Sequence, residues 1–575
     1  MTKRALYVFV FSVLAPALLM ASVTVGPKGK KPFALKGDET ALVAKPSVTP
    51  GVAKVGTAGP GDSLLFTTYD YGSNGAPNHN IVNFGDGTFA IGRMAAVLPA
   101  SADRGTWYSY NDGTGWRTPV KVEAARRGWS NIDQYKDAGG TEVTVSHTGL
   151  RVNVHDAKGG TVWSEFSTGS TAGSTWPKLA AGGETYLHIV AASAGSGAAN
   201  TDVFYTRSAD GGASFDKVDV PVPATAGESN ADGYDIAAQG AKVALLVCGS
   251  GGDVVLLTST DNGDTWTETI VYDITAPAEL PAGTFQEQPD GSGSVIFDNA
   301  GNPHVVFGTA TAIADSGQAG YYTLDNSVMY WSAATGAKVI TKTIQDEGLL
   351  DWAGSPGVDG GYVTGPDIAV DAANQVFVTY MQSLTEVDIA NPDSGFNYTH
   401  IYGIGSTDGG ATWGAAKDLT PGTGLDATYP SIADLVDTDV HMVYYADVVP
   451  GNAIQGNHAE NTTTAVKYFK IPAADFFTTD VKPLDQVPGS FVLSQNYPNP
   501  FNPSTKIQYA IPAGSFVTLK VFDVLGREVA TLVNQEQTAG VYEATFDASN
   551  LANGAYVYQL RAGSFSQVKT MMLLK

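Results

Sequence analysis

A strand–turn–strand unit that recurs along most of the chain constrains the fold more than any other feature of the sequence. In each copy a short apolar run leads to a turn of Gly, Asn or Asp, and a second, more strongly apolar run follows. Neighbouring copies start 47 to 73 residues apart, and the pattern is that of strands throughout. The seven copies begin at Ile81, Ile132, Leu179, Ile236, Val295, Ile368 and Ile432.

Repeated hairpins of this length predict the blades of a β-propeller. A single hairpin cannot bury both of its faces, whereas hairpins packed around a common axis bury one another. We therefore predict an all-β chain that contains a β-propeller of seven blades. Six and eight blades are alternatives, because a strand donated at ring closure changes the count by one.

The amino-acid composition and net charge exclude some classes of binding partner. The chain has 575 residues, 66 of them Gly and 29 Pro, which suits short strands joined by tight turns. Its net charge of −24 repels phosphate groups and anionic membranes, so nucleic acid is not an expected partner. Cys248 is the only cysteine, so no intrachain disulfide forms, and its apolar neighbours predict a buried side chain.

The N-terminal residues have the order of a secretory signal. Lys3 and Arg4 precede the apolar run Ala5–Met20, and the small residue Ala21 follows. The run contains Pro16 and is shorter than the ~20 residues that span a membrane. We therefore expect a cleaved signal peptide and no transmembrane segment in the mature chain.

The predicted organisation has five parts. They are a signal peptide over residues 1–22, a linker or pro-segment over 23–60, the propeller over 61–472, a linker over 473–490, and a small immunoglobulin-like β-sandwich over 491–575.

Turns between the third and fourth strands of three repeats share one motif. Its Ser and Asp oxygens suit the N–H groups of the turn, its Gly supplies positive φ, and its aromatic residue folds back over the hairpin. Weaker copies lie at Asn111–Trp116 and His155–Trp163. The motif residues are Ser208, Asp210, Gly212 and Phe215, then Ser259, Asp261, Gly263 and Trp266, then Ser406, Asp408, Gly410 and Trp413.

These turns resemble the Asp-box, or bacterial neuraminidase repeat, of sialidases and related propellers. The resemblance implies a sialidase-like propeller scaffold. It implies a structural role for the motif residues and says little about activity.

The C-terminal region begins with a proline-rich stretch and continues as alternating apolar and polar residues. Three prolines remove donors from any strand ladder, so we expect an extended lead-in along the edge of a small antiparallel sandwich. The motif residues of this region are Asn496, Pro498, Asn499, Pro500, Phe501, Asn502, Pro503, Gly526 and Arg527.

This region resembles the C-terminal sorting domain of type IX secretion cargo over roughly the last 85 residues. The resemblance implies export from the bacterial cytoplasm and then transport across the outer membrane. It implies the type IX machinery as a partner, and a product that is released or held at the cell surface.

Arginine is sparse in the propeller region, which bears on sialidase activity. A sialidase resemblance would require three arginines that grip a carboxylate, a Tyr nucleophile with a Glu partner, and an Asp acid/base. No arginine of residues 61–472 lies beyond Arg207, and the sialidase Phe-Arg-Ile-Pro motif is absent. Sialidase activity is therefore disfavoured. The arginines of this region are Arg93, Arg104, Arg117, Arg126, Arg127, Arg151 and Arg207.

Metal-binding patterns are also weak. Oxygen donors cluster at Asp298–Asn302 and Asp371–Asn374, but neither segment fits the twelve-residue calcium loop. Both are expected at hairpin turns between first and second strands. The eight histidines show no zinc-like spacing. We expect no metal and no cofactor.

Several predicted blades have a long segment after their second strand, and several have a long segment before their first strand. In a propeller these segments share one face, and the Asp-box turns lie on the other. Aromatic residues on them suit stacking on sugars or gripping a peptide, although they could also only pack the loops down. The aromatic residues expected at this rim are Tyr321, Tyr322, Trp352, Phe396, Tyr398 and Tyr429.

The expected function is that of an extracellular propeller that binds carbohydrate or protein at its loop-rich face. A secreted glycoside hydrolase is the alternative, and a structural surface protein without a ligand is a third class. Two carboxylates about 5 to 10 Å apart at the central channel would favour the hydrolase.

Overall fold

A computed structural model describes residues 59–574, apart from a set of gaps between them. The gaps are 137–138, 148, 194–200, 224–227, 230, 250–251, 275–284, 316–317, 345–362, 388–396, 455–457, 459–463, 478–491, 494, 497–498, 500, 512–514, 524–526, 538–539, 549–550 and 563–564.

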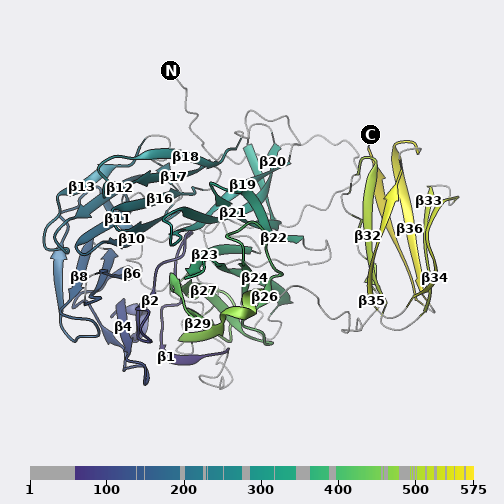
Figure 1. Ribbon diagram of the computed structural model, residues 1–575. Helices are drawn as coiled ribbons and strands as arrows, with labels where there is room; N and C mark the ends of the chain where they lie inside the picture. The colour runs from purple at the N-terminus through teal and green to yellow at the C-terminus, as the bar shows by residue number, and fades with distance from the viewer. Residues whose placement is uncertain are drawn as a thin grey trace.

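Seven antiparallel sheets follow one another along the described chain, each with a core of four strands (Figure 1). Two short strands extend two of these sheets. β14 (Glu228–Ser229) pairs with a strand of blade 3, and β28 (Leu435–Val436) pairs with a strand of blade 6. Blade 1 comprises β2 (Ile81–Asn83), β3 (Phe89–Ala95), β4 (Gly105–Asn111) and β5 (Val120–Lys121); blade 2 comprises β6 (Gly128–Gln134), β7 (Glu142–His147), β8 (Arg151–His155) and β9 (Trp163–Ser167); blade 3 comprises β10 (Gly173–Gly182), β11 (Tyr186–Ser193), β12 (Thr201–Ser208) and β13 (Lys217–Pro221). Blade 4 comprises β15 (Tyr234–Gln239), β16 (Lys242–Val247), β17 (Val254–Ser259) and β18 (Thr267–Tyr272); blade 5 comprises β19 (Phe285–Phe297), β20 (Pro303–Asp315), β21 (Gln318–Ser332) and β22 (Gly336–Ile344); blade 6 comprises β23 (Val363–Asp371), β24 (Val376–Val387), β25 (Asn397–Ser406) and β26 (Lys417–Asp418).

Blade 7 closes the ring with strands from both ends of the propeller. Its inner strands are β27 (Asp426–Ile432), β29 (Asp439–Asp447) and β30 (Ala465–Pro472), and its outermost strand is β1 (Asp62–Phe66). The first strand of each blade contacts the first strand of the next, and β2 of blade 1 contacts β29 of blade 7. The described residues between Asp62 and Pro472 therefore form a closed propeller of seven blades, as the repeats predicted.

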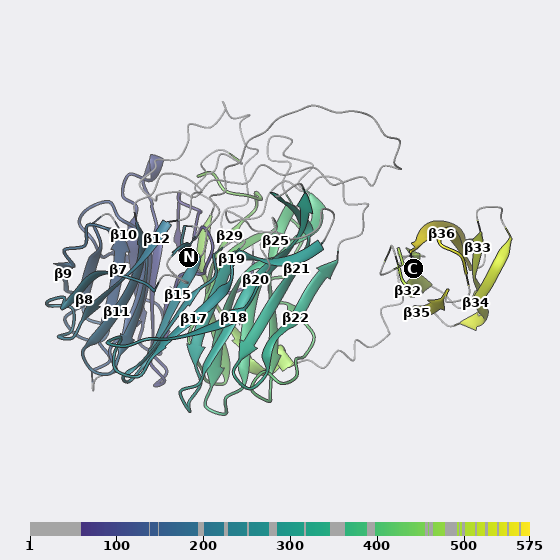
Figure 2. The same ribbon diagram turned by 90° about the horizontal axis from the view of Figure 1, so that it is seen from above.

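The two faces of the ring carry different connections. In blade 3 the N–H of Gly211, in the Asp-box turn, donates to the main-chain oxygen of Thr185, in the turn between β10 and β11. At the other end of the same hairpin Ser193, the last residue of β11, pairs with Gly173, the first of β10. The long segments that follow second strands therefore leave from the face opposite the Asp-box turns. Figure 2 shows the blades from the side.

Apolar clusters fill the space between neighbouring blades. Cys248, at the end of β16, is fully buried, as predicted, and burial raises the pKa of its thiol well above the ordinary value. Among the described residues there are two 3₁₀ turns, η1 (Pro99–Ser101) and η3 (Ala473–Phe477). Within the described residues, no helix is both long and apolar enough to cross a membrane.

The C-terminal strands form a sandwich of two sheets, drawn in yellow-green and yellow in Figure 1. Phe501 pairs in parallel with Leu573, and its N–H donates to the oxygen of Met572 at 2.9 Å, so the lead-in lies along an edge strand as expected. Pro498, Pro500 and Gly526 lie outside the described residues. One sheet has the order β31 (Val492–Leu493), β32 (Ser504–Ile511), β35 (Gly540–Asp547), and the other β34 (Glu528–Gln537), β33 (Ser515–Asp523), β36 (Gly554–Ala562), β37 (Phe565–Leu573).

Candidate functional site

Residues 67–80, between β1 and β2, cross the centre of the ring on the loop-rich face and are here named the axial segment. All of them are buried except Gly75 and His79, which are partly exposed. The carboxylate of Asp232, between blades 3 and 4, accepts hydrogen bonds from Ser73 Oγ at 2.8 Å and from the N–H of Asn74 at 3.2 Å. Contacts from the far side of the ring thus hold a segment that belongs to blades 7 and 1.

Lys178 of blade 3 fixes the second half of the axial segment. Its Nζ donates to the main-chain oxygens of Ala76 and Pro77 and to Asn78 Oδ1, each at 2.7 Å. The side chain is fully buried, and burial lowers the pKa of its ammonium group while nearby carboxylates, first among them Asp232, oppose that shift. The ammonium group thus supplies donors to three buried oxygens, of which that of Ala76 also accepts from the hydroxyl of Ser73.

A ring of buried polar residues surrounds the central channel, and Asn80, the last residue of the axial segment, is one of them. Each of them immediately precedes one of the seven repeat starts. Several bond to the neighbouring blade: Ser431 Oγ accepts from the N–H of Asn80 at 2.9 Å, and Asp235 Oδ2 accepts from the N–H of Val295 at 3.0 Å. The ring consists of Asn80, Asn131, Lys178, Asp235, Ser294, Asp367 and Ser431.

Histidine and carboxylates meet in this channel. His79 Nε2 lies 2.9 Å from Asp235 Oδ1, and its Nδ1 lies 3.6 Å from Asp434 Oδ1. Burial alone would lower the pKa of His79, but the two carboxylates raise it well above its ordinary value. Burial raises the pKa of Asp367 to about 7, although the positive charge of His79 acts to lower it.

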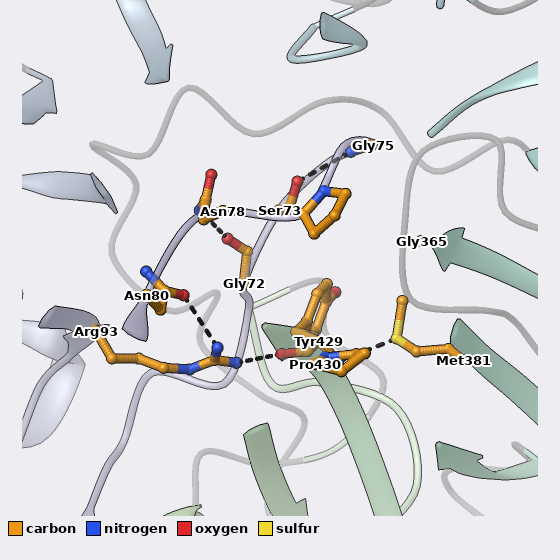
Figure 3. A pocket seen from close by; sticks show the side chains of 11 residues that line it. Gly72, Ser73, Gly75, Asn78, Asn80, Arg93, Gly365, Met381, Tyr429 and Pro430 are labelled. Atoms are coloured by element: carbon orange, nitrogen blue, oxygen red, sulfur yellow. Dashed lines mark hydrogen bonds between the residues drawn. The ribbon is translucent and has the colours of Figure 1, made fainter. Parts of the chain in front are cut away.

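A small pocket opens beside the axial segment (Figure 3). Its free space of about 10 Å³ is enough for about one water molecule. The pocket is lined by Gly72, Ser73, Gly75, Pro77, Asn78, Asn80, Arg93, Gly365, Met381, Tyr429 and Pro430. Arg93 is the one charged residue of this lining, and none of the eleven is a carboxylate or a histidine.

Arg93, on β3, is buried without a carboxylate as its hydrogen-bond partner. Its Nη1 donates to Asn80 Oδ1 at 3.0 Å, and its Nη2 donates to the main-chain oxygen of Tyr429 at 2.7 Å (Figure 3). Its Nε has no hydrogen-bond partner among the described residues. Burial lowers the pKa of Arg93, although the nearby Tyr445 opposes the shift. A buried guanidinium whose hydrogen-bond partners are neutral is stabilised by an anionic group beside it.

The aromatic residues expected at the rim lie in different environments. Tyr429 lines the pocket and is 7% exposed, and Tyr398 is buried with its hydroxyl donating to the main-chain oxygen of Val448 at 3.2 Å. Tyr321 and Tyr322 lie in β21, in the part whose side chains are not described. Trp352 and Phe396 lie outside the described residues.

Tyr429 has an unusual backbone that the sequence did not indicate. Its φ is +52°, at a bulge of β27, and its N–H donates to Met381 Sδ at 3.0 Å. Trp129 repeats the arrangement in blade 2, with φ +49° and a 3.1 Å bond to Met94 Sδ. Positive φ at bulky residues is rare and is held only where the surrounding packing fixes it. The ring of inner strands is therefore tightly constrained at this face.

The three Ser-x-Asp-x-Gly turns share one pattern of internal hydrogen bonds. In blade 6 Ser406 Oγ accepts from the N–H of Gly410 at 2.8 Å and donates to Asp408 Oδ1 at 2.8 Å. Asp408 also accepts from the N–H and the hydroxyl of Thr412, and these bonds lower its pKa to about 2. The turns of blades 3 and 4 repeat the pattern with Asp210 and Asp261.

Three histidines of the second strands bond to tyrosines of the third strands, which the sequence analysis missed. The signal was present, because each histidine stands at the same place in its repeat, just before the apolar run of the second strand. Tyr330 goes on to donate to the oxygen of Gly409 at 2.9 Å and so reaches the Asp-box turn of the next blade. The pairs are His188–Tyr205 at 2.7 Å, His304–Tyr330 at 2.5 Å and His441–Tyr468 at 2.6 Å.

Both oxygen-rich turns considered as metal loops are hairpin turns. Asp298 Oδ1 accepts from the N–H groups of Ala300 and Asn302, at 2.9 and 2.8 Å. Asp371 Oδ1 accepts from those of Ala373 and Gln375 in the same way. Their expected turn chemistry is confirmed.

These observations define the class of the chain: a seven-bladed β-propeller followed by a β-sandwich. Residues 495–574 match the family described as "Secretion system C-terminal sorting domain". The chain therefore has a type IX sorting domain, and that system exports it to the cell surface or the medium.

Several solved structures are similar to this chain. They include an ulvan lyase of a new polysaccharide lyase family, at 11% identity and TM-score 0.40, which covers 72% of this chain and 96% of that one. The NanB sialidase of Streptococcus pneumoniae has 12% identity and TM-score 0.34, over 72% of this chain and 71% of that one. A Trypanosoma rangeli sialidase has 12% identity and TM-score 0.34, over 90% and 88%. No curated protein sequence matches the chain.

Proposed function

We propose that this protein, once exported, binds carbohydrate at its loop-rich face without cleaving it, with the axial pocket as one anchor point. The observation that supports this most is the lining of that pocket. It offers a guanidinium, two side-chain amides and a tyrosine, and it has no carboxylate and no histidine among its eleven residues. Such a set donates and accepts hydrogen bonds, and its one candidate for proton transfer, the hydroxyl of Tyr429, is buried, which raises its pKa well above the ordinary value.

The lining also favours an acidic sugar. Both hydrogen-bond partners of Arg93, Asn80 Oδ1 and the oxygen of Tyr429, are neutral, and its Nε–H has no partner among the described residues. A sugar carboxylate or sulfate at the pocket mouth would supply the missing counter-charge. The pocket has room for little more than one water molecule, so it would admit one oxygen of the charged group while the rest of the sugar lies outside.

The hydrolase alternative needs two carboxylates that reach a substrate. Asp235 and Asp367 face the channel, but they are 0% and 5% exposed, and both accept N–H groups of the next blade. Their bonds hold the blades together, which supports binding over hydrolysis.

A glycan array probed with the mature, full-length protein tests the proposal. We expect binding to glycans with uronic acid or sulfate groups, at least tenfold weaker for Arg93→Gln and partly kept by Arg93→Lys. The matched control is Arg151→Gln, an arginine of blade 2 away from the pocket.

Blank wells, or acidic glycans bound equally well by Arg93→Gln, would contradict it. Release of shorter sugars from the bound glycans would instead support the hydrolase. Because the net charge of −24 repels an acidic glycan at long range, added salt should strengthen this binding.

A further inference from the structure

A second cluster of chemistry-bearing residues lies on the loop-rich face, where the axial segment leaves blade 7. It consists of Asp70 of the axial segment, Asp447 at the end of β29, and His458 between β29 and β30. The three side chains are 6%, 5% and 7% exposed. One ligand atom from each lies within 4.8 Å of those from the other two.

The two carboxylate oxygens of Asp70 differ in their hydrogen bonding. Its Oδ2 accepts from the N–H of Ala453 at 2.8 Å, while its Oδ1 is buried and has no hydrogen-bond partner among the described residues. A buried carboxylate oxygen without a donor is costly, and such oxygens in native proteins call for a ligand, an ion or a water.

Another acidic side chain lies next to this cluster. A third carboxylate, Asp426, is 3% exposed and is the cross-strand partner of Asp447. Asp426 already accepts the N–H groups of Thr399 and Gly451. The neighbouring carboxylates Asp70 and Asp447 thus lie in a buried, negatively charged environment that a cation would neutralise.

The remaining contacts orient the cluster toward a common point. Asp447 Oδ1 accepts from the N–H of Val448 at 2.6 Å, and its Oδ2 accepts from the hydroxyl of Thr464. Outer hydrogen bonds of this kind fix ligand carboxylates in metal sites. His458 Nε2 stands 3.4 Å from Asp70 Oδ2, close to the edge of roughly 3.3 Å expected between two ligands of a tetrahedral zinc ion.

We propose that Asp70, Asp447 and His458 bind one divalent cation, Zn²⁺ in preference to Ca²⁺, which fastens the axial segment to blade 7. An imidazole nitrogen with two carboxylate oxygens is a donor set typical of zinc, whereas calcium takes oxygen ligands. Three protein ligands leave a fourth position for water. The site stands apart from the Arg93 pocket, since none of its residues lines that pocket.

The test uses the full-length protein stripped with a chelator, then titrated with Zn²⁺ or Ca²⁺ alone. We expect one Zn²⁺ per chain by elemental analysis and a higher thermal unfolding temperature with Zn²⁺ than in chelator. His458→Gln should weaken Zn²⁺ binding at least 100-fold. Asp70→Asn should also lose the metal while staying folded, because it removes one of the crowded buried carboxylates.

The matched control is His400→Gln, a buried histidine 2.8 Å from the Asp418 carboxylate and outside the cluster. It should bind Zn²⁺ as the unmodified protein does. The proposal is overturned if no stoichiometric Zn²⁺ binds, if His458→Gln binds it with unchanged affinity, or if only Ca²⁺ stabilises the protein. Each of these readings is independent of glycan binding.

Discussion

Arg93 of blade 1 donates from Nη2 to the main-chain oxygen of Tyr429 in blade 7, over 2.7 Å. Its guanidinium carbon also lies 3.9 Å from the ring centre of Tyr445, another residue of blade 7. The two blades meet where the ring closes, since β1 of the N-terminal end completes blade 7. The side chain that anchors the proposed ligand therefore also joins the first blade to the last.

Replacing Arg93 with methionine should destabilise the propeller by about 3 kcal/mol. The change removes charged donors from Asn80 Oδ1 and the oxygen of Tyr429, both buried, and hydrogen bonds to charged groups contribute about 1.5–3 kcal/mol each. Urea unfolding followed by tryptophan fluorescence measures the loss. Arg151→Met, which removes a partly exposed ion pair with Glu165, should change stability by less than about 1 kcal/mol. Equal losses for the two variants would refute a closing role for Arg93.

Gly75→Ala should loosen the axial segment. A Cβ at this position would come within 2.5 Å of the main-chain oxygen of Gly291 in blade 5, which cannot move without its strand. Overpacking of this kind costs about 1–3 kcal/mol. Hydrogen exchange of residues 72–80 should become faster. Gly115→Ala is the control, because no atom lies within 4 Å of its Cβ, and unchanged exchange in Gly75→Ala would argue against a tightly packed segment.

Ser406→Ala should destabilise blade 6 more than the neighbouring Thr407→Ala. Ser406 Oγ accepts the N–H of Gly410, and without it that buried N–H is left unsatisfied at a cost of about 1–3 kcal/mol. Thr407 is exposed and outside the motif contacts. The difference between the two unfolding free energies measures the Asp-box contribution, and a difference near zero would mean that the turn is held by packing alone.

The blades could be predicted from the sequence because each depends on local information. The apolar alternation after Ile236 or Ile368 specifies strands, and Ser-x-Asp-x-Gly specifies the turn whose bonds Asp261 and Asp408 make. Seven such units bury one another's faces when they pack around a common axis, so they form a ring.

The centre of the ring could not be predicted in the same way. Residues 67–80 have the Gly, Asn and Pro content of an exposed loop, and they are buried only because Asp232 and Lys178, far along the chain, supply their hydrogen bonds. Tyr429 was expected as a rim residue, but its positive φ turns it into the wall of a pocket, and no local sequence signal marks that conformation. The polar residue before each repeat start can be seen in the sequence, but its hydrogen bonds to the neighbouring blade form only when the ring is closed.

The contribution of Asp367 to stability should fall as the pH rises from about 4 to 7. An unfolded aspartate ionises near 3.9, whereas burial keeps the Asp367 carboxyl protonated up to about 7, with His79 opposing the shift and Asp235 and Asp434 reinforcing it. Between these values the folded state binds more protons than the unfolded state, so raising the pH favours unfolding, by at most about 4 kcal/mol for this group. Asp367→Asn, which keeps an oxygen for the N–H of Ile432, should flatten the profile. His79, with its raised pKa, also loses stabilising charge at higher pH, whereas His188, whose pKa burial lowers to about 3, changes stability in the opposite direction. Both histidines are present in the two variants, so the difference between the two pH profiles measures Asp367. Urea unfolding at pH 5 and pH 8 measures both variants, and an equal decline in the two would show that Asp367 is ionised throughout.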